Sequence, residues 1–284
     1  MSRIVYLNGS YLPEMEAKVS IFDRGFLFAD AVYEVTTVLG GKLVDFPAHM
    51  ARLRRSLGEL DMEPPLEDDD LLDVHRTLVR LNELEEGGIY LQISRGAAER
   101  DFLFPEEATP TVALFTQARS LVDAPLAARG ARIVSTPDIR WGRRDIKTVQ
   151  LLAPSMCKTM AKEAGADDAW MVEDGAVTEG TSNNAYIVTK EGVIVTRQLS
   201  NAILHGITRA SVLRLAEEAQ MRIEERPFTI PEAQDAAEAF VTAATSLVTP
   251  VVEIDGVAIG DGAPGPIARR LREIYIDESR RTAI

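Results

Sequence analysis

The stretch DDAWMVEDGAVTEGTSNNAYIV, residues 167–188, contains two apolar runs separated by a short acidic segment. Two apolar runs separated by a short polar segment predict a strand, a turn and a second strand. Glu179 falls in the predicted turn, followed by the small polar residues of the TSNN sequence. Taken alone, it is most simply a solvated glutamate. A carboxylate in this setting could also bind a protonated ring nitrogen.

Upstream of this stretch, DIKTVQLLAPSM begins at Asp145 and places Lys147 at the edge of an apolar run, just before a predicted helix. The neighbouring cations Arg143 and Arg144 already supply charge. An arginine stays protonated at any ordinary pH, whereas a desolvated lysine can lose its proton and attack a carbonyl. A solvated lysine at the end of an element is the simpler interpretation of this stretch by itself.

The length and composition fit an ordinary globular protein. The chain has 284 residues, of which 46% are hydrophobic and 26% charged, which suits one large domain or two of ordinary size. The net charge of -13 argues against a protein that neutralises a nucleic-acid backbone. No apolar run reaches signal-peptide or membrane-span length, so we expect no membrane association.

Cys157 is the single cysteine. It therefore forms no disulfide within the chain and no thiolate metal cage, which favours a reducing, cytoplasmic location. On a helix interior it is most simply a small buried hydrophobe. The three histidines, His49, His75 and His205, are spread along the sequence, and we expect no metal site. Motifs for dinucleotides, triphosphates and serine nucleophiles are absent.

The periodicities predict two α+β halves, residues 1–120 and 121–284, joined by a turn-prone segment from Ser120 to Gly130. Hairpins are expected around Asn8-Gly9 and Gly40-Gly41. In the first half, helices are expected in residues 49–61 and 68–84 and strands in 89–96 and 111–118. In the second half, helices are expected in residues 148–165, 205–219 and 263–281, and strands in 131–137, 222–228, 238–245 and 250–256.

Several faint signals point to the same chemistry. The sequence Gly206-Ile207-Thr208 stands where a helix begins, and a helix start offers unpaired N–H groups to an anion. Arg52 on the first helix could clamp a phosphate or carboxylate. Combined with Lys147 for an aldehyde and Glu179 for a pyridinium nitrogen, these groups describe pyridoxal phosphate, a cofactor that acts as an electron sink.

Ordered motifs along nearly the whole chain resemble those of the fold-type IV pyridoxal-phosphate enzymes, most closely the bacterial D-amino-acid aminotransferases. The motifs are DRGFLFADAVYEV (23–35), HMARL (49–53), RWGRRDIKTVQLL (140–152), the stretch 167–188, HGITR (205–209) and VTAATSLVTPVVEIDG (241–256). The resemblance implies a two-lobed α+β or α/β fold with the cofactor between the lobes and the cofactor lysine in the C-terminal domain.

The resemblance also implies roles for individual residues toward the cofactor. Lys147 would form the Schiff base and, once freed, move the α-proton. Glu179 would bond the pyridine nitrogen, and Leu204 would pack on the ring. The phosphate would be held by Arg52, by the amides of Ile207 and Thr208, and by the turn at Ala244 and Thr245. Ala244 stands where relatives typically carry a hydroxyl, so Thr245 is expected to compensate in part.

Toward the substrate, the resemblance implies that Tyr33 and Arg100 face the carboxylate. The segment Arg100-Asp101-Phe102-Leu103-Phe104-Pro105 departs from the family pattern, because Phe102 replaces a histidine. One carboxylate donor is thereby lost, and we expect a more apolar pocket.

The implied activity is ping-pong transamination between a D-amino acid and a 2-oxo acid through pyridoxamine phosphate, in a cytoplasmic homodimer. The alternatives are a branched-chain L-amino-acid or R-amine aminotransferase and, in another class, an aminodeoxychorismate lyase. A non-enzymatic relative that only binds a small molecule is the further possibility. We expect small amino acids and 2-oxo acids as partners, and no nucleic acid.

Overall fold

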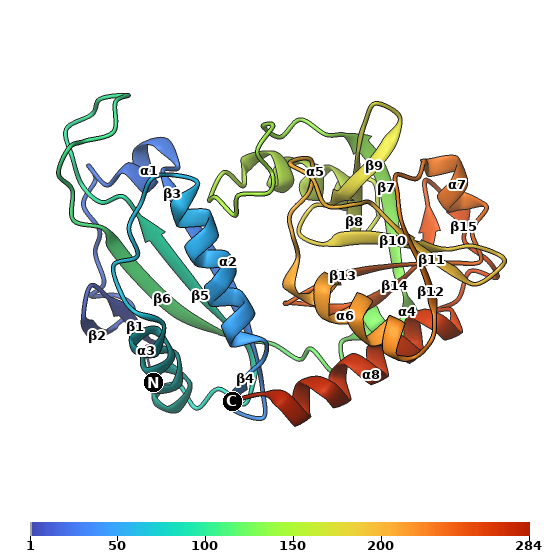
Figure 1. The fold of residues 1–284 in the computed structure, drawn as a ribbon, viewed down its shortest axis with the longest axis horizontal. Helices are drawn as coiled ribbons and strands as arrows, with labels where there is room; N and C mark the ends of the chain where they lie inside the picture. Colours follow the sequence, from blue (N-terminus) through green and yellow to red (C-terminus); the bar gives the residue numbers. More distant parts are fainter. Residues whose placement is uncertain (1) are drawn as a thin grey trace. The chain divides into compact units, whose positions relative to one another are not determined.

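The computed structural model describes residues 2–284, which form two compact units (Figure 1). Unit 1 contains residues 2–120, Ile146–Gln150 and Ser279–Ile284, and unit 2 contains Leu121–Asp145 and Leu151–Glu278. Each unit has its own β-sheet.

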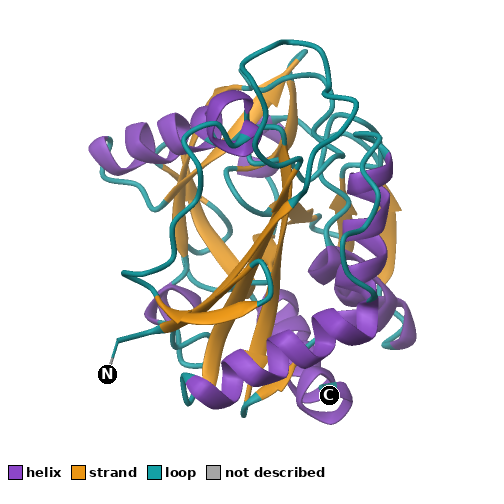
Figure 2. Ribbon diagram, turned by 90° about the vertical axis from the view of Figure 1, so that its left-hand side faces the viewer, coloured by secondary structure: helices purple, strands orange, loops and turns teal. Residues whose placement is uncertain are grey.

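Unit 1 is built on a six-stranded antiparallel sheet in the order β2-β1-β6-β5-β3-β4. In Figure 2 the orange strands nearest the viewer cross as a twisted layer, as β-sheets do. The strands are β1 (Ile4–Leu7), β2 (Ser10–Pro13), β3 (Ala31–Leu39), β4 (Lys42–Leu43), β5 (Glu86–Ser94) and β6 (Thr111–Ala118). The helices are α1 (Arg24–Phe28), α2 (Phe46–Gly58) and α3 (Asp68–Leu81).

Local sequence accounts for most of this unit. The predicted hairpins at Asn8-Gly9 and Gly40-Gly41 are confirmed, and all four turn residues have the positive φ that such tight turns require. The helix predicted in residues 49–61 is confirmed as α2, which begins earlier, at Phe46. Its apolar face, with Met50, Leu53 and Leu57, is buried in the core cluster of unit 1.

Unit 2 contains a nine-stranded mixed sheet in the order β12-β11-β10-β13-β14-β7-β8-β9, with β15 paired to β14. The strands are β7 (Ala131–Pro137), β8 (Asp168–Glu173), β9 (Ala176–Gly180), β10 (Asn184–Val188), β11 (Val193–Thr196), β12 (Arg222–Glu225), β13 (Glu238–Ala243), β14 (Leu247–Ile254) and β15 (Val257–Ala258). The helices are α4 (Pro125–Arg129), α5 (Leu152–Glu163), α6 (Ile207–Glu218), α7 (Ile230–Gln234) and α8 (Pro266–Thr282), of which the last turn, from Ser279, belongs to unit 1.

The position of Lys147 differs from the prediction. We expected this residue in the second half of the chain, but Ile146–Gln150 packs with unit 1. The backbone N–H of Tyr33 donates to the Lys147 carbonyl at 3.0 Å, and Val149 N–H donates to the Ala31 carbonyl at 3.1 Å. These bonds and the bridge between Val32 and Thr148 tie the segment to β3. Helix α5 begins only at Leu152, later than predicted.

The stretch 167–188 also differs, since it forms three strands rather than two. β9 pairs with β8 around Asp174 and Gly175, both of which have positive φ, and the pairs include Val172 with Val177. Glu179 therefore lies on strand β9 and not in a turn. Burial on a strand excludes the solvated glutamate that is the simplest interpretation of the sequence.

Within residues 2–284, every helix is too short or too polar to cross a bilayer. The same residues include no group of three or more histidine, cysteine, aspartate or glutamate side chains placed to hold a metal ion.

His75 lies on α3 in the core of unit 1, with its ring against the edge of Phe46 at 5.1 Å. Its Nδ1 is 2.6 Å from the Leu71 carbonyl, and its Nε2 has no hydrogen-bond partner among the described residues. Burial lowers the pKa of His75 from 6.5 to about 4, although the Leu71 carbonyl acts in the opposite direction. The folded protein therefore holds this imidazole neutral.

We predict that acid destabilises the fold through this residue. An unfolded histidine takes up a proton below about pH 6.5, whereas the folded one does not until about pH 4. The free energy of unfolding should therefore fall as the pH drops through this window. Urea titrations at several pH values should show that His75→Phe flattens this part of the profile. The control His205→Gln, in a loop of unit 2, should retain the wild-type slope, and an unchanged slope in His75→Phe would contradict the assignment.

Candidate active site

The residues that the sequence predicts for cofactor and substrate divide between the two units. Unit 1 holds Tyr33, Arg52, Arg100, Phe102 and Lys147. Unit 2 holds Glu179, Leu204, Ile207, Thr208, Ala244 and Thr245.

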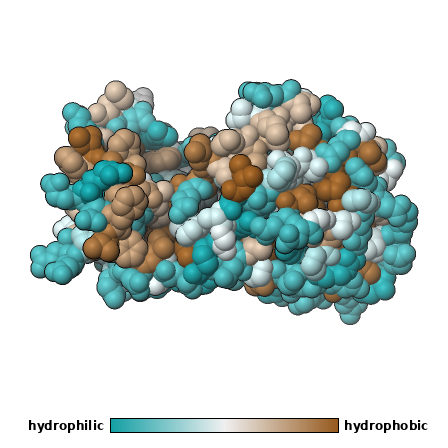
Figure 3. Space-filling model, turned by 90° about the horizontal axis from the view of Figure 1, so that it is seen from above, coloured by the Kyte–Doolittle hydropathy of each residue, from teal (hydrophilic) through white to brown (hydrophobic). Residues whose placement is uncertain are grey.

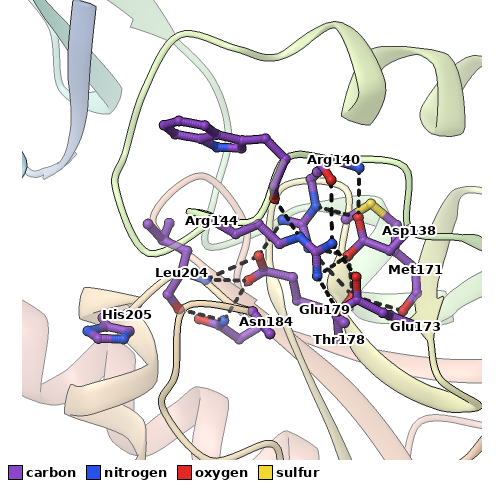
Figure 4. A network of polar contacts seen from close by, with 12 residues as sticks. Asp138, Arg140, Arg144, Met171, Glu173, Thr178, Glu179, Asn184, Leu204 and His205 are labelled. Atoms are coloured by element: carbon purple, nitrogen blue, oxygen red, sulfur yellow. Dashed lines mark hydrogen bonds and ion pairs between the residues drawn. The ribbon is translucent and has the colours of Figure 1, made fainter.

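Glu179 is the centre of a polar network in unit 2 (Figure 4). Its side chain is buried, with 4% of the residue exposed. Arg140 Nη1 donates to Oε1 at 2.5 Å, Asn184 Nδ2 donates to Oε2 at 2.9 Å, and the Leu204 backbone N–H donates to both oxygens at 3.1 and 3.2 Å. These donors hold the carboxylate in one orientation.

The network extends beyond Glu179 as a chain of alternating charges. Arg140 also pairs with Asp138 at 2.7 Å, and Arg144 bridges Asp138 at 3.3 Å and Glu173 at 2.6 Å. In this network the carboxylates of Asp138, Glu173 and Glu179 share the guanidinium groups of Arg140 and Arg144. When all five groups are ionised, the network has one more negative charge than positive charges. A cationic group bound beside Glu179 would neutralise it.

Burial and neighbouring charge act against each other at Glu179. Burial is the largest effect and raises the pKa of the Glu179 carboxyl above its usual value; the charge of Arg140 and the hydrogen bonds from Arg140 and Leu204 offset this only in part. A second cation beside this carboxyl would favour its ionised form further. Glu179 is thus a buried acceptor whose charge responds to what binds next to it.

Asn184 links Glu179 to the beginning of α6. Its Nδ2 also donates to the Leu204 carbonyl at 3.0 Å. Gly206 is the N-cap of α6, and a Cβ at this position would lie 2.1 Å from Asn184 Oδ1. Only glycine fits here, and it provides no side-chain cap to the helix. The first N–H groups of α6, at Ile207 and Thr208, therefore point to a place where an anion can bind.

The last predicted residues of unit 2, Ala244 and Thr245, lie half-buried in the tight connection between β13 and β14. The Ser246 N–H donates to the Ala243 carbonyl at 3.2 Å and closes this turn. Their predicted contact with a phosphate stays a prediction.

In unit 1, the Lys147 amine lies 4.0 Å from the centre of the Tyr33 ring. Tyr33 stacks on Tyr90 at 5.4 Å, and Tyr90 stacks on Phe115 at 4.8 Å. Burial raises the pKa of the Tyr90 hydroxyl, so this part of the row stays neutral. The aromatic row gives Lys147 an electron-rich and largely apolar neighbour.

Arg52 is paired with Glu34 in the core of unit 1. Its Nε and Nη2 donate to the two carboxylate oxygens at 2.7 and 2.6 Å, and His49 Nδ1 is 2.7 Å from Oε2. Burial opposes ionisation of Glu34, but the charge and hydrogen bonds of Arg52 outweigh it and lower the pKa of Glu34 to about 2. Glu34 is therefore ionised and fixes the plane of the guanidinium.

Arg100 and Phe102 lie on the loop between β5 and β6. The Arg100 side chain is exposed, and its guanidinium is 5.6 Å from the Phe28 ring. Phe102 is 79% exposed and packs edge-on against Phe28. The loop thus holds Phe102 outward, and its expected place in an apolar substrate pocket stays a prediction.

Several members of this site cannot be recognised from the motifs alone. Glu34 and His49 belong to none of the predicted roles, although a carboxylate on the inward face of a strand must find a cation. Arg140 lies in one of the motifs, but the sequence assigns it no role. Its partner Glu179 is 39 residues away, too far for a local pattern to reveal the pair. The useful signal is that a charged residue among inward-facing apolar positions requires a partner.

Comparison with known proteins places the site in a family. Residues 31–254 match the family described as amino-transferase class IV. The chain is 39% identical over 272 residues to a D-alanine aminotransferase of Staphylococcus aureus, covering 95% of each sequence. It is 39% identical over 268 residues to the D-alanine aminotransferase of Bacillus licheniformis, covering 94% of each.

Solved structures share the fold. The branched-chain amino acid aminotransferase of the archaeon Thermoproteus uzoniensis, solved with norvaline, has a TM-score of 0.85 and 27% identity, over 97% of this chain and 94% of that one. The branched-chain enzyme of Escherichia coli has a TM-score of 0.88 and 20% identity, over 98% and 95%, which supports the fold alone. A further branched-chain enzyme, with a TM-score of 0.90 and 28% identity over 99% and 95%, was solved with pyridoxamine 5'-phosphate.

We predict that Glu34→Gln lowers the free energy of unfolding by about 3–5 kcal/mol, because it leaves the buried Arg52 without its counter-charge. The matched control Glu14→Gln breaks an exposed pair with Arg3 and should cost no more than about 1 kcal/mol. Urea denaturation at pH 7 measures both. Since the pKa of Glu34 falls from 4.5 to about 2 on folding, its contribution should be lost as the pH drops through that range. Equal effects of the two variants would argue against the buried pair.

Proposed function

Because the chain belongs to the class IV aminotransferase family, we propose that it transfers an amino group between a D-amino acid and a 2-oxo acid with the help of pyridoxal phosphate. The observation that carries this proposal is the identity of 39% to D-alanine aminotransferases over 95% of both chains. The substrate class comes from these relatives, whereas the residues of the site supply the chemistry.

The chemistry of the site fits the cofactor. The surplus negative charge of the Glu179 network suits a protonated pyridine nitrogen, and the uncapped start of α6 suits a phosphate. Asn184 joins these two features by bonding both Glu179 and the Leu204 carbonyl. In this assignment Leu204 packs on the ring, and Ile207 and Thr208 contact the phosphate.

Further residues complete the assignment. Arg52 would share its guanidinium between Glu34 and the phosphate, and the turn at Ala244 and Thr245 would add backbone donors. Lys147 would hold the cofactor aldehyde, and Tyr33 and Arg100 would bind the substrate carboxylate. Phe102 would limit which side chains fit near Arg100.

When bound, the cofactor supplies an electron sink for the carbanion that forms at the amino-acid α-carbon. The residues of the protein would move the α-proton, hold a negative charge beside the ring nitrogen and orient the substrate. Lys147 Nζ would take the α-proton and return it, because it is the amine beside the substrate. The carboxylate of Glu179, held by Arg140 and Leu204, would keep its acceptor oxygens directed at the ring nitrogen. Arg100 would orient the substrate, and so select the enantiomer that presents its α-proton to Lys147.

We also propose that the active form is a homodimer in the cytoplasm. The apolar strand β3 lies inside the sheet and is mostly buried, so it offers no exposed surface to a partner. Apolar side chains nevertheless reach the surface elsewhere, shown brown in Figure 3. The exposed apolar side chains of the protein include Met15, Ile21, Phe26, Leu103 and Leu152, each at least 70% exposed, and a contiguous patch of such side chains would favour a protein interface. The single cysteine suits a reducing compartment.

We predict that borohydride reduction of the protein loaded with pyridoxal phosphate bleaches its colour and attaches the label at Lys147. Mass spectrometry of peptides identifies the position. Lys147→Arg should carry no label and lose at least about 10³-fold in kcat, since arginine cannot supply a neutral amine. The control Lys162→Arg, on α5, should be labelled at Lys147 and remain active. Label elsewhere in the wild type would refute the assigned role.

We predict that, with 2-oxoglutarate as acceptor, D-alanine is a better donor than L-leucine or an R-amine by at least about 10²-fold in kcat/KM, a difference of about 2.7 kcal/mol. Coupled assay of the products measures this ratio. A preference for L-leucine would identify a branched-chain enzyme, and a preference for the R-amine would identify an amine transaminase. Release of pyruvate from aminodeoxychorismate with no acceptor present would identify the lyase.

A further inference from the structure

The β5–β6 loop, residues 95–110, joins two neighbouring antiparallel strands. Apart from a single β-bridge between Ala97 and Asp23, it contains no helix or strand, and a connection of this length usually serves a function. It carries Arg100 and three consecutive apolar residues, Phe102, Leu103 and Phe104, which are 79%, 77% and 54% exposed. Water would favour the collapse of such a segment onto an apolar surface, so its outward conformation requires specific attachment.

The attachment comes from Arg24, a buried residue at the start of α1. Its Nη1 donates to the Asp101 carbonyl at 2.7 Å and to the Leu103 carbonyl at 3.3 Å. Its Nε donates to Asp30 at 2.7 Å. Hydrogen bonds from a charged donor are about twice as strong as neutral ones. One guanidinium therefore ties the tip of the loop to the body of unit 1.

Arg95 strengthens this attachment from the base of the loop. Its Nε and Nη2 pair with the same Asp30 carboxylate at 2.8 and 3.2 Å, and its Nη2 also donates to the Leu60 carbonyl at 2.6 Å. The Phe104 ring stacks 3.8 Å from the Arg95 guanidinium. Asp30 thus orients two arginines, each of which contacts the loop.

Aromatic contacts transmit this arrangement to Arg100. The guanidinium of Arg24 lies 4.5 Å from the Phe28 ring, and Phe102 packs edge-on against the same ring at 5.6 Å. The Arg100 guanidinium is 5.6 Å from Phe28 and 5.8 Å from Phe102. The location of Arg100 therefore depends on a loop conformation that Arg24 holds from below.

We propose that Arg24 is a positioning residue for substrate binding: by bonding the Asp101 and Leu103 carbonyls, it fixes the β5–β6 loop and with it Arg100. This inference rests on the proposed function, in which Arg100 binds the substrate carboxylate. It also gives a role to the segment DRGF, residues 23–26, which the proposed cofactor site does not use. Asp23 supports the same corner by accepting hydrogen bonds from Ser94 and Thr111.

The test uses Arg24→Lys in the full-length enzyme loaded with pyridoxal phosphate. Lysine keeps the charge beside Asp30 but lacks the planar fork that reaches the carboxylate and both carbonyls together. Hydrogen exchange of peptides covering residues 97–106 should become at least about tenfold faster. KM for D-alanine should rise about tenfold, while kcat and cofactor content stay within about twofold. The control Arg3→Lys, whose arginine bonds Glu14 and the Thr116 carbonyl, should change neither the exchange nor KM.

A double-mutant cycle shows whether Arg24 acts through Arg100. In the Arg100→Ala background, Arg24→Lys should change KM by less than about twofold, because the group that it positions is already gone. A full additional effect there would overturn the proposal, as would a folded Arg24→Lys variant with unchanged loop exchange or unchanged KM.

Phe104→Ala provides a second, independent variant, since this half-exposed ring can be removed without opening the core. Like Arg24→Lys, it should speed hydrogen exchange of the loop and raise KM for D-alanine. If Arg24→Lys fails to fold, a Phe104→Ala variant with unchanged exchange and unchanged KM would overturn the proposal. A wild-type enzyme inactive toward D-alanine would overturn the proposed function. The exchange measurement does not depend on activity, and it alone decides whether Arg24 holds the loop.

Discussion

The Glu179 carboxylate lies almost wholly out of water, 2.5 Å from the Arg140 guanidinium. A buried charge costs several kcal/mol unless another charge and good hydrogen bonds compensate it. Here the compensation continues through Asp138 and Arg144 to Glu173, close to the surface. The geometry of the carboxylate is therefore set by a chain of partners, and a change at Asp138 or Arg140 would be felt at the proposed ring-nitrogen acceptor.

The same constraint recurs at two places in unit 1. Glu34 is ionised in the core because Arg52 and His49 contact it, and this contact in turn orients the guanidinium proposed for the phosphate. Asp30 lies between Arg24 and Arg95 and holds both beneath the β5–β6 loop. In each case a carboxylate with no proposed ligand of its own orients an arginine that has a proposed role: Glu34 orients Arg52, and Asp30 orients Arg24. Rigid support of this kind is what precise substrate placement requires.

Much of the candidate site could be predicted from the sequence, because its parts lie in short motifs. Glu179 stands among small polar residues, and Gly206 precedes a helical pattern, so both could be identified locally. The supporting residues could not be found in this way. Glu34 and Arg52 are 18 positions apart, and Arg140 and Glu179 are 39 apart. Such pairs depend on which strand lies beside which helix, and side-chain periodicity contains no information about that.

By itself, the sequence determined the local elements of this protein: the hairpin turn at Asn8-Gly9, the apolar stripe of α2, and the helix start after Gly206. These follow from backbone preferences and from the fixed direction of side chains along a strand or helix. Three features depend on contacts that form only in the complete fold: Lys147 pairs with β3 in unit 1, Glu179 is buried on a strand, and Arg24 donates hydrogen bonds to a loop 77 residues away. A backbone or charged group that is buried must form hydrogen bonds, because leaving it unpaired costs free energy. Which groups lie within hydrogen-bond distance depends on the complete fold.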